Sequence, residues 1–154
     1  MEISFRQFKP SDKQSVISLM GIFNQYIQSI DDKHRTDYKE GSSEYFVDKM
    51  IGLIQTKQGV IYLACDDNVA IGFVSGHVDA QDEDEIMETI PALPGVVGEL
   101  FVSPEYRGLK IGKQLLEMIE KYLKDEGCTI VRFPVFAPNK SARQFYKKAG
   151  YSER

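Results

Sequence analysis

The sequence has little cysteine, little histidine, no tryptophan and no long apolar run. Its two cysteines, Cys65 and Cys128, are far apart in apolar segments, so we expect reduced, buried thiols rather than a disulfide framework or a zinc site. The two histidines match no metal-ligand spacing, so no metal is expected. No stretch approaches the roughly 18 apolar residues of a membrane helix, and the first ten residues lack a signal peptide's hydrophobic segment. A cytoplasmic protein without a membrane partner is therefore expected.

Basic residues are missing from one third of the chain. Residues 58–106 hold ten acidic residues and no Lys or Arg, whereas residues 107–154 hold eleven basic and five acidic ones, within a net charge of -4. With 42% apolar residues in 154, the chain is long enough to bury a core, and one domain over residues 1–154 is expected. These values exclude disordered and collagen-like classes.

The hydrophobic pattern predicts five strands and four main helices. Alternating or β-branched apolar runs predict strands at 1–8, 60–65, 69–78, 96–102 and 128–136. Helical spacing and capping residues predict helices that begin at Ser11, at Ser42 or Ser43, after Gly108 and at Asn139. The acidic stretch 79–88 is expected to be an exposed loop or a short irregular helix. The predicted fold class is α/β of the α+β type, a mixed, mostly antiparallel sheet flanked by helices with one parallel crossover.

The segment from Gly98 to Lys113, GELFVSPEYRGLKIGK, is the most informative part of the chain. Its pattern predicts a strand, a tight turn and the first turn of a long helix. Such a turn exposes backbone N–H groups at the positive end of a helix, which suits phosphate oxygens. Arg107, Lys110 and Lys113 add positive charge beside it. The segment alone is also compatible with a simple connection.

Two motifs in the second half of the chain resemble those of the GNAT superfamily of N-acyltransferases. Residues 107–112, RGLKIG, resemble its acyl-CoA pyrophosphate loop, Gln/Arg-x-x-Gly-x-Gly/Ala, and residues 139–151, NKSARQFYKKAGY, resemble its N-x-x-A-x-x-F-Y-x-x-x-G-F/Y signature. One helix and one strand separate the motifs, as in the family. The resemblance implies the GNAT-like fold and direct transfer of an acetyl group from acetyl-CoA to the primary amine of a small cationic substrate or a peptide.

The resemblance also implies roles for individual residues. Tyr146 stands where the family places the acid that protonates the departing thiolate, and Glu99 is expected to be the base or an amine ligand, unless it is only a surface carboxylate of its strand. The resemblance implies contacts with acetyl-CoA by the end of this strand, the loop, the helix start and a later cap: Leu100, Phe101, Val102, Arg107, Gly108, Leu109, Lys110, Ile111, Gly112, Lys113 and Asn139. A backbone N–H near Phe101 or Val102 would stabilise the oxyanion.

The chain departs from the family pattern at two places. Lys110 replaces the middle glycine of the loop, which restricts the approach of the backbone to the pyrophosphate, while its ammonium group adds a point charge. The family adds a strand pair after the final helix, but this sequence stops at Arg154. Either the sequence is shortened, or a strand exchanged within a homodimer covers the sheet edge.

Several alternatives remain open from the sequence. The cluster at residues 82–85 is either a solvated acidic loop or an attractor for a polyamine, an aminoglycoside-like amine or a lysine-rich peptide. His77 is either a reserve base or a surface histidine. A non-catalytic acyl-CoA-binding domain of the same fold is the alternative to an enzyme. Binding of nucleic acid is disfavoured because the pI is near 5.2 and no recognition motif is present.

Overall fold

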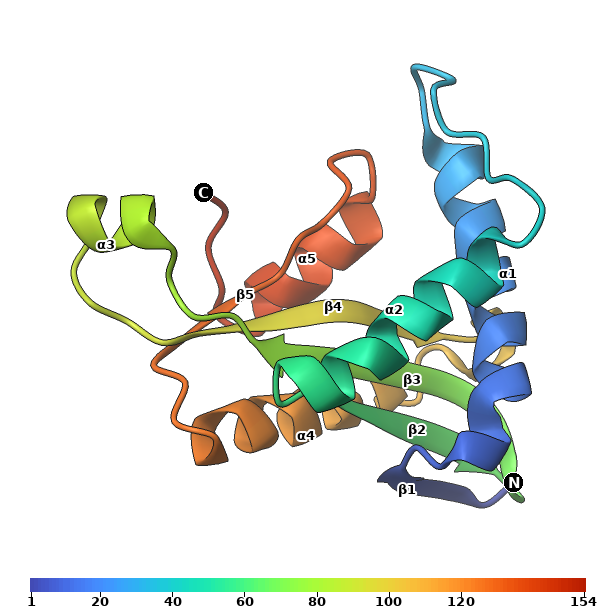
Figure 1. The fold of residues 1–154 in the computed structure, drawn as a ribbon. Helices are drawn as coiled ribbons and strands as arrows, with labels where there is room; N and C mark the ends of the chain where they lie inside the picture. The colour runs from blue at the N-terminus through green and yellow to red at the C-terminus, as the bar shows by residue number, and fades with distance from the viewer.

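The computed structural model describes residues 1–154 as a five-stranded sheet flanked by helices, which confirms the predicted fold class (Figure 1). The strands lie in the order β1-β2-β3-β4-β5, with β1 to β4 antiparallel and β5 parallel to β4. Their bounds are β1 Ile3–Gln7, β2 Val60–Asp66, β3 Val69–Val78, β4 Pro94–Val102 and β5 Ile130–Arg132.

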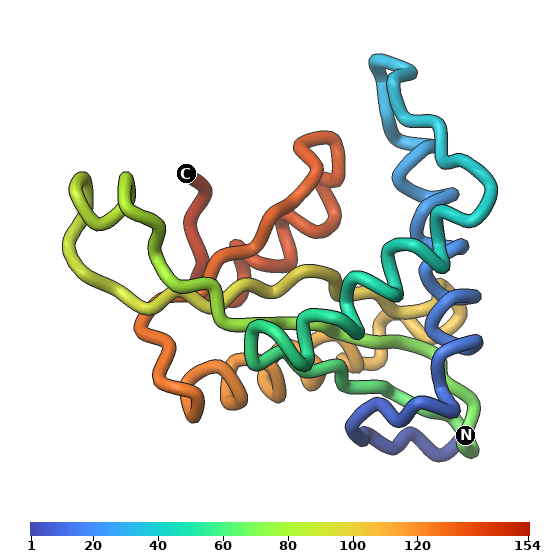
Figure 2. Tube along the Cα trace, viewed as in Figure 1, coloured from blue at the N-terminus to red at the C-terminus, as the bar shows by residue number.

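Five α-helices and two short 3₁₀ turns connect the strands. The helices are α1 Lys13–Ile30, α2 Ser42–Thr56, α3 Glu83–Glu88, α4 Ile111–Asp125 and α5 Lys140–Lys148, and the 3₁₀ turns span Pro10–Asp12 and Pro104–Tyr106. The tube in Figure 2 shows that the connection from α1 to α2 and the arm that carries α3 both project well away from the sheet. None of the helices combines the length and apolar character needed to cross a membrane.

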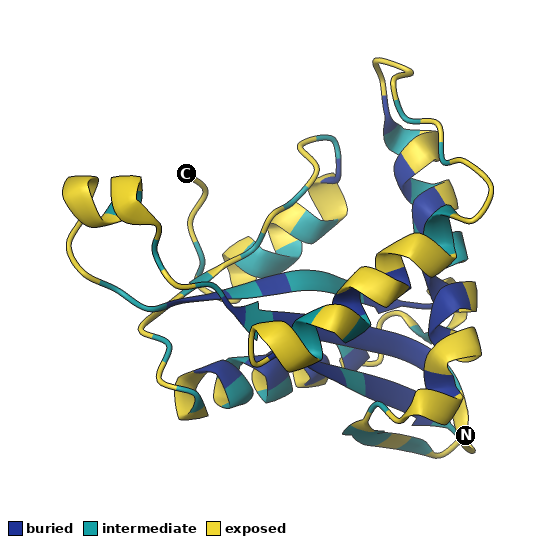
Figure 3. Ribbon diagram, viewed as in Figure 1, coloured by how far each residue is buried: buried dark blue, intermediate teal, exposed yellow.

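The sheet separates two hydrophobic cores. On one face α1 and α2 cover the strands, and on the other face α4 does so (Figure 3). The aromatic residues of α5, Phe145 and Tyr146, pack against the core on the α4 side. Strand β2 shows the division, because Ile61 and Leu63 face α1 and α2 while Val60 and Ala64 face α4. Because successive side chains of a strand point to opposite faces of the sheet, β2 contributes residues to both cores. The most central strands are accordingly apolar on both faces.

Strand β4 contains a bulge next to the point where it leaves β5. Val74 of β3 pairs with Leu100 and Gly76 pairs with Val97, so one residue of β3 faces the two residues Gly98 and Glu99 of β4. Such a bulge re-aims a side chain, and here it turns Glu99 toward the α1 and α2 side. Strand β5 pairs only with Pro94 to Val96, so the outer edge of β4 from Val97 onward has no neighbouring strand.

The structure corrects three details of the sequence prediction. The strand expected at 128–136 is limited to Ile130–Arg132, because Pro134 has no N–H for the ladder and the chain leaves β4 there. Ser11 lies in a 3₁₀ turn and does not cap α1. Neither serine caps α2, whose N-cap is Gly41 in the left-handed conformation.

Other local predictions are confirmed. Asn139 caps α5 by accepting a hydrogen bond from Ala142 N–H at 3.2 Å. The chain leaves α4 and α5 through Gly127 and Gly150, both with positive φ. Both cysteines are free, but only Cys65 is buried, while Cys128 is half-buried.

Candidate functional site

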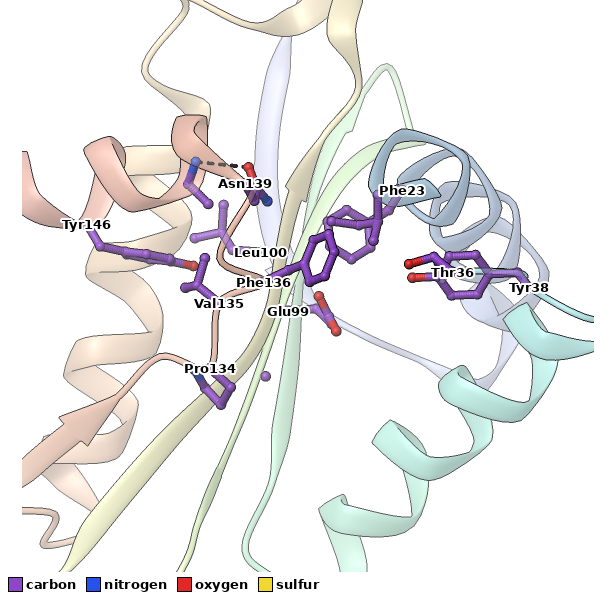
Figure 4. A pocket seen from close by; sticks show the side chains of 13 residues that line it. Phe23, Thr36, Tyr38, Glu99, Leu100, Pro134, Val135, Phe136, Asn139 and Tyr146 are labelled. Carbon is purple, nitrogen blue, oxygen red and sulfur yellow. Dashed lines mark hydrogen bonds between the residues drawn. The ribbon is translucent and has the colours of Figure 1, made fainter. Parts of the chain in front are cut away.

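A cavity of about 240 Å³ lies where β4 and β5 separate (Figure 4). Its walls come from five parts of the chain: α1, the α1–α2 connection, the bulge of β4, the segment after β5, and α5. Because β5 ends early, residues 134–136 line this opening as irregular chain rather than as a strand. The cavity is therefore a consequence of the same divergence that left the edge of β4 free.

Glu99 is the only ionisable carboxylic acid in this cavity. Its side chain makes no hydrogen bond or ion pair with any other protein group, whereas its backbone N–H donates to Ser75 Oγ at 3.2 Å. Burial raises the pKa of Glu99 to about 7, since the charged form loses its water without gaining a partner. The bulge thus holds a carboxyl group that exchanges its proton near neutral pH.

Tyr146 enters the same cavity from α5, on the opposite side from the α1–α2 connection. Its ring packs on Phe133 with centroids 4.2 Å apart and on Phe145 with centroids 5.3 Å apart. Burial, and secondly the charge of Glu99, raise the pKa of Tyr146 above its usual value. The phenol is therefore protonated at neutral pH, available as a hydrogen donor and electrostatically coupled to Glu99.

The start of α4 presents a run of free backbone donors. Lys110 caps α4 with a left-handed backbone, φ 63°, and Gly108 also has a positive φ of 80°. The N–H groups of residues 108–113 have no protein acceptor, and the first helical bond runs from Gln114 N–H to the carbonyl of Lys110. This nest of donors at the positive end of a 15-residue helix suits phosphate oxygens.

The left-handed backbone also explains why a glycine is expected at position 110. A side chain in this conformation is strained by roughly 1 kcal/mol, which glycine avoids. In this chain Lys110 adopts the conformation all the same, and its exposed side chain stands at the mouth of the loop together with the Lys113 side chain. Lys110 thus keeps the left-handed backbone conformation that a glycine would favour at this position.

The Arg107 side chain is directed back onto the fold. Its Nε donates to the carbonyl oxygen of Val102 at 3.2 Å, and its guanidinium lies 5.8 Å and 5.7 Å from the ring centroids of Tyr26 and Phe101. These contacts fix the end of β4 against α1. Among the basic residues predicted for the anion loop, Lys110 and Lys113 are therefore freer to meet a phosphate than Arg107.

The remaining predicted residues lie around the cavity or behind it. Leu100 and Asn139 line it, and the Tyr26 hydroxyl lies 3.5 Å from Asn139 Oδ1. Phe101 and Val102 are buried in opposite cores, so only their backbone faces the free edge of β4. Leu109 is 47% exposed at the loop tip, whereas Ile111 is buried, and a Cβ at Gly112 would lie 3.6 Å from the Phe145 ring.

The sequence prediction missed the wall formed by α1 and the α1–α2 connection. Phe23, Thr36 and Tyr38 line the cavity opposite Tyr146. Asp31 organises this connection, because its carboxylate accepts hydrogen bonds from the N–H groups of Lys33, Arg35 and Thr36 and from the Thr36 hydroxyl at 2.7–3.0 Å. An Asp at a helix end followed by a polar stretch is the sequence signal for such a turn, but it does not indicate what the turn faces.

A second cavity, of about 150 Å³, adjoins Glu99 beneath α2. His77 lines it, and burial lowers the pKa of this histidine, so the imidazole is mostly neutral at pH 7. The acidic cluster at residues 82–85 lines neither cavity. Instead Asp82 caps α3 and Glu85 pairs with Arg132 at 3.0 Å. No group of three His, Cys, Asp or Glu side chains is arranged to hold a metal ion.

The fold and this cavity together define a class of protein. The chain has an open strand edge, a helix start with free N–H groups, and a cavity that Glu99 and Tyr146 both line, in a mixed α/β fold. The comparison with protein families agrees, because the model of the acetyltransferase (GNAT) family matches residues 27–151. The chain therefore belongs to the GNAT acetyltransferase family.

Two curated relatives match over short segments. An uncharacterised N-acetyltransferase of Methanocaldococcus jannaschii is 40% identical over 58 residues, which is 38% of this chain and 26% of that protein. The thialysine N-epsilon-acetyltransferase of Bos taurus is 36% identical over 52 residues, which is 34% of this chain and 31% of that protein. The chain thus spans less than a third of the length of these relatives.

Solved structures match over nearly the whole chain. Glucosamine-6-phosphate N-acetyltransferase from Arabidopsis thaliana has a TM-score of 0.70 and 20% identity, with 100% of this chain and 94% of that chain covered. AAC(6')-Iy in complex with the bisubstrate analogue CoA-S-monomethyl-acetylneamine has a TM-score of 0.71 and 15% identity, with 99% and 92% covered. At these identities the likeness shows the fold.

Proposed function

We propose that this protein is an N-acetyltransferase that moves the acetyl group of acetyl-CoA to a primary amine. The observation that carries the proposal is the position of Glu99, an unpartnered, half-buried carboxyl group in one cavity with Tyr146. A group with a pKa near 7 accepts a proton from an amine at neutral pH and releases it again after turnover. Glu99 lies beside the free edge of β4, where an extended acyl-CoA arm could bind, and this position supports acyl transfer as the reaction.

The chain has the donors that acetyl-CoA requires. The N–H groups of residues 108–113 fit the pyrophosphate, with Lys110 and Lys113 as point charges, and the free edge of β4 from Val97 to Val102 fits an extended amide-bearing arm. When bound, acetyl-CoA supplies an activated acyl group as a thioester. The residues at the end of this path are Glu99, Leu100 and Tyr146, so the binding loop and the proton-transfer groups lie along one route.

Glu99 is the base in this proposal. An alkyl amine has a pKa of about 10.4, so formation of the free amine at pH 7 costs roughly 4–5 kcal/mol in water. The Glu99 carboxylate accepts this proton, and the aromatic walls around it disfavour the charged amine, which lowers the cost further. Once Glu99 is neutral, its charge no longer raises the pKa of Tyr146. Removal of the amine proton therefore makes Tyr146 a better acid.

Tyr146 is the acid for the departing sulfur. The protonated amine gives one proton to Glu99, and its nitrogen lone pair forms the C–N bond while the C–S bond breaks. The Tyr146 hydroxyl gives its proton to the sulfur, and the second amine proton returns to the Tyr146 oxygen. The products are the acetylated amine, the free thiol and one proton on Glu99, which water removes. A backbone N–H of Phe101 or Val102 at the free edge of β4 stabilises the carbonyl oxygen in this scheme.

The relatives narrow the acceptor only to an amine. Their names refer to the amine of thialysine, to an amino sugar phosphate and to an aminoglycoside. A common element of these acceptors is a primary amine that is protonated in solution. The cavity of about 240 Å³ favours a small acceptor or one extended side chain over a folded protein surface.

The proposal is tested by acetyl-CoA turnover with a panel of amines, measured as release of free thiol. For Tyr146→Phe we expect turnover at saturating substrate to fall by about two orders of magnitude, while affinity for CoA changes less than about threefold, because the hydroxyl acts only on the departing sulfur. Lys124→Ala, on the exposed side of α4, is the matched control with wild-type turnover. Turnover unchanged in Tyr146→Phe removes the role of the tyrosine.

A non-catalytic acyl-CoA-binding domain is the second candidate, favoured by the lysine at position 110 of the loop. Calorimetric CoA binding without thiol release from any amine supports that candidate against the enzyme. Glu99→Gln adds an independent check, since a base with a pKa of about 7 makes kcat/KM rise with pH through neutrality. In Glu99→Gln this rise is expected to move to higher pH, toward the pKa of the free amine.

A further inference from the structure

We propose that the second cavity binds a carboxylate carried by the acceptor, so that the acceptor is a small amino acid whose terminal amine reaches Glu99 while its acid group meets Lys49. The proposal deepens the proposed function and depends on it. It concerns a part of the molecule that neither the loop motif nor the signature around Tyr146 involves. The observations are the shape of the cavity, the charges on its walls and their separation.

The second cavity connects the catalytic carboxyl group to α2. Glu99 and Gly98 line both cavities, so the bulge of β4 stands between them. From there the second cavity runs along β3 past Ser75, Gly76 and His77. Its volume of about 150 Å³ is below the range of about 300–1,000 Å³ that is typical of sites for larger ligands. It therefore accommodates a short chain and excludes a sugar ring system or a polypeptide.

One face of α2 forms the roof of this cavity. Phe46, Lys49, Met50 and Leu53 follow the i, i+3, i+4, i+7 spacing of a single helix face, and all four line the cavity. Three of them, with Met20 of α1, give an apolar wall suited to methylene groups. Lys49 is the only permanent charge in this roof, and thus the only strong ligand for an anionic group.

Lys49 is not neutralised by the protein. It forms no ion pair, and its Nζ lies 5.7 Å from the centroid of the Tyr45 ring. The neighbouring acid on α2, Asp48, is paired with Lys13 at 2.7 Å. On the strand side Lys57 and Asp79, the two charged groups that act on His77, pair with each other at 3.0 Å. The rim of the cavity therefore carries one uncompensated positive charge.

His77 adds a second donor to the lining of the same cavity, from β3. Burial lowers its pKa, so at pH 7 it is a neutral imidazole with one N–H that can donate to a carboxylate. Asp79 and Lys57 act on it in opposite directions, which leaves burial as the dominant cause. A carboxylate between Lys49 and His77 would receive one charge-assisted and one neutral hydrogen bond.

The positive and negative ends of the chamber lie on different elements. Glu99 belongs to the bulge of β4, whereas Lys49 belongs to α2, which forms the roof of the cavity. An acceptor that reaches both ends therefore needs several methylene groups between its amine and its carboxylate. A compact α-amino acid without a second amine is too short to do so.

The same geometry disfavours polycations. The acidic residues 82–85 line neither cavity, and two of them are committed to the cap of α3 and to Arg132. A second ammonium group in the chamber beneath α2 would approach Lys49 without a partner. A diamine or polyamine is thus expected to be a poorer acceptor than an amino acid of equal length.

The experiment compares three acceptors of similar length: 5-aminopentanoate, pentylamine and 1,5-diaminopentane. Thiol release from acetyl-CoA is measured for the full chain at pH 7.5 and low salt. We expect kcat/KM to be about tenfold higher for 5-aminopentanoate than for either of the other amines, as one charge-assisted contact implies. In Lys49→Ala this preference is expected to fall to about twofold or less, and in Lys49→Arg to be largely restored. Lys124→Ala is the control that keeps the wild-type preference.

Each outcome decides between the alternatives. A preference for 5-aminopentanoate that disappears in Lys49→Ala and returns in Lys49→Arg supports the subsite. Equal use of the three amines, a preference for the diamine, or a preference that survives in Lys49→Ala overturns the subsite and leaves the proposed function intact. Thiol release at background with every amine, while CoA binds, overturns the proposed function and the subsite with it. Circular dichroism of each variant excludes misfolding as the cause.

Discussion

At the scale of single residues, two positions on the proposed binding route reduce the stability of the chain. Glu99 is half-buried without a partner, and Lys110 holds a left-handed backbone conformation. Natural proteins retain such costs mostly where function requires them, so these residues are the places where stability and activity should oppose each other.

Glu99→Gln is therefore expected to stabilise the protein while it removes activity. The folded-state pKa of about 7 lies above the usual value of 4.5, so ionisation of Glu99 destabilises the fold progressively as pH rises from about 4.5 to 7. Above pH 7 the neutral amide should add up to about 3 kcal/mol and raise Tm by several degrees. At pH 4, where both side chains are neutral, the two proteins should melt together. Destabilisation of the variant at both pH values would contradict a half-buried, unpartnered carboxylate.

Lys110→Gly separates the backbone and the charge of the anion loop. Glycine relieves the strain at φ 63° but increases the entropy of the unfolded chain, so the free energy of unfolding should change by less than about 1 kcal/mol. Affinity for CoA should fall about threefold to tenfold with a weaker dependence on salt, because a point charge beside the phosphates is lost. Calorimetric titrations at two salt concentrations measure both effects, and Lys110→Arg is the charge-preserving control. Tighter binding by Lys110→Gly would show that backbone approach matters more than charge.

At the scale of elements, the site depends on two interruptions of regular structure. The bulge at Gly98 and Glu99 turns a strand carboxylate into the cavity, and the early end of β5 opens the edge of β4. The α1–α2 connection closes the opposite side, and Asp31 fixes its shape. The Thr36 hydroxyl, followed by the backbone N–H groups, lowers the pKa of Asp31 to about 2, so this carboxylate stays charged throughout the neutral range.

Asp31→Ala should loosen the wall of the cavity without unfolding the sheet. Three backbone N–H groups and one hydroxyl lose their acceptor, while no core side chain is removed. We expect the KM for the amine to rise about tenfold with a smaller change in affinity for CoA, and hydrogen exchange to speed up at residues 33–36. Asp31→Asn keeps one acceptor oxygen and should be intermediate. Unchanged KM with accelerated exchange would show that the connection does not contact the acceptor.

At the scale of the whole molecule, charge and core are organised by the two faces of the sheet. The cores on the α1–α2 face and the α4 face share the strands, so we expect them to unfold together. The Arg6 and Asp12 pair, 2.7 Å apart, ties β1 to the start of α1, and this hydrogen bond lowers the pKa of Asp12 to about 2. The fold thus lowers the pKa of Asp12 and raises the pKa of Glu99 within the same domain.

The stability of the molecule should therefore peak between about pH 4 and pH 5. Asp12 has a depressed pKa, so its contribution of about 2 kcal/mol is present above pH 4 and lost as pH falls toward 2. Glu99 has a raised pKa, so stability declines as pH rises from 4.5 to 7. Thermal unfolding between pH 2 and pH 9 measures both limbs. Glu99→Gln should flatten only the alkaline limb, and Asp12→Asn only the acid limb; a profile that keeps rising to pH 7 would contradict the assignment.

The sequence predicted most elements because their signals are local. Alternation in residues 60–65 and 69–78, helical spacing in 111–125 and the cap at Asn139 need no distant contact to be recognised. The prediction was wrong where a local signal was outweighed. Ser11 and Ser42 are good capping residues, but a proline turn and a left-handed Gly41 set the helix starts instead. The strand after Cys128 ends at Arg132 because Pro134 supplies no N–H for the ladder and the chain leaves β4 there.

The sequence by itself determined the family resemblance, because the spacing of two motifs is local to the chain. That resemblance and the strand pattern at residues 96–102 also predicted the anion loop at 107–112, Tyr146 and Glu99 as site residues. Only the tertiary structure decided their surroundings. It directed Arg107 against α1 rather than toward the loop, excluded the acidic cluster from both cavities, and brought Tyr38 and Lys49 to the two sides of Glu99. The physical reason is that burial and long-range proximity depend on how helices cover the sheet. Residues of distant helices and loops contribute as much to the environment of Glu99 as its neighbours in the strand.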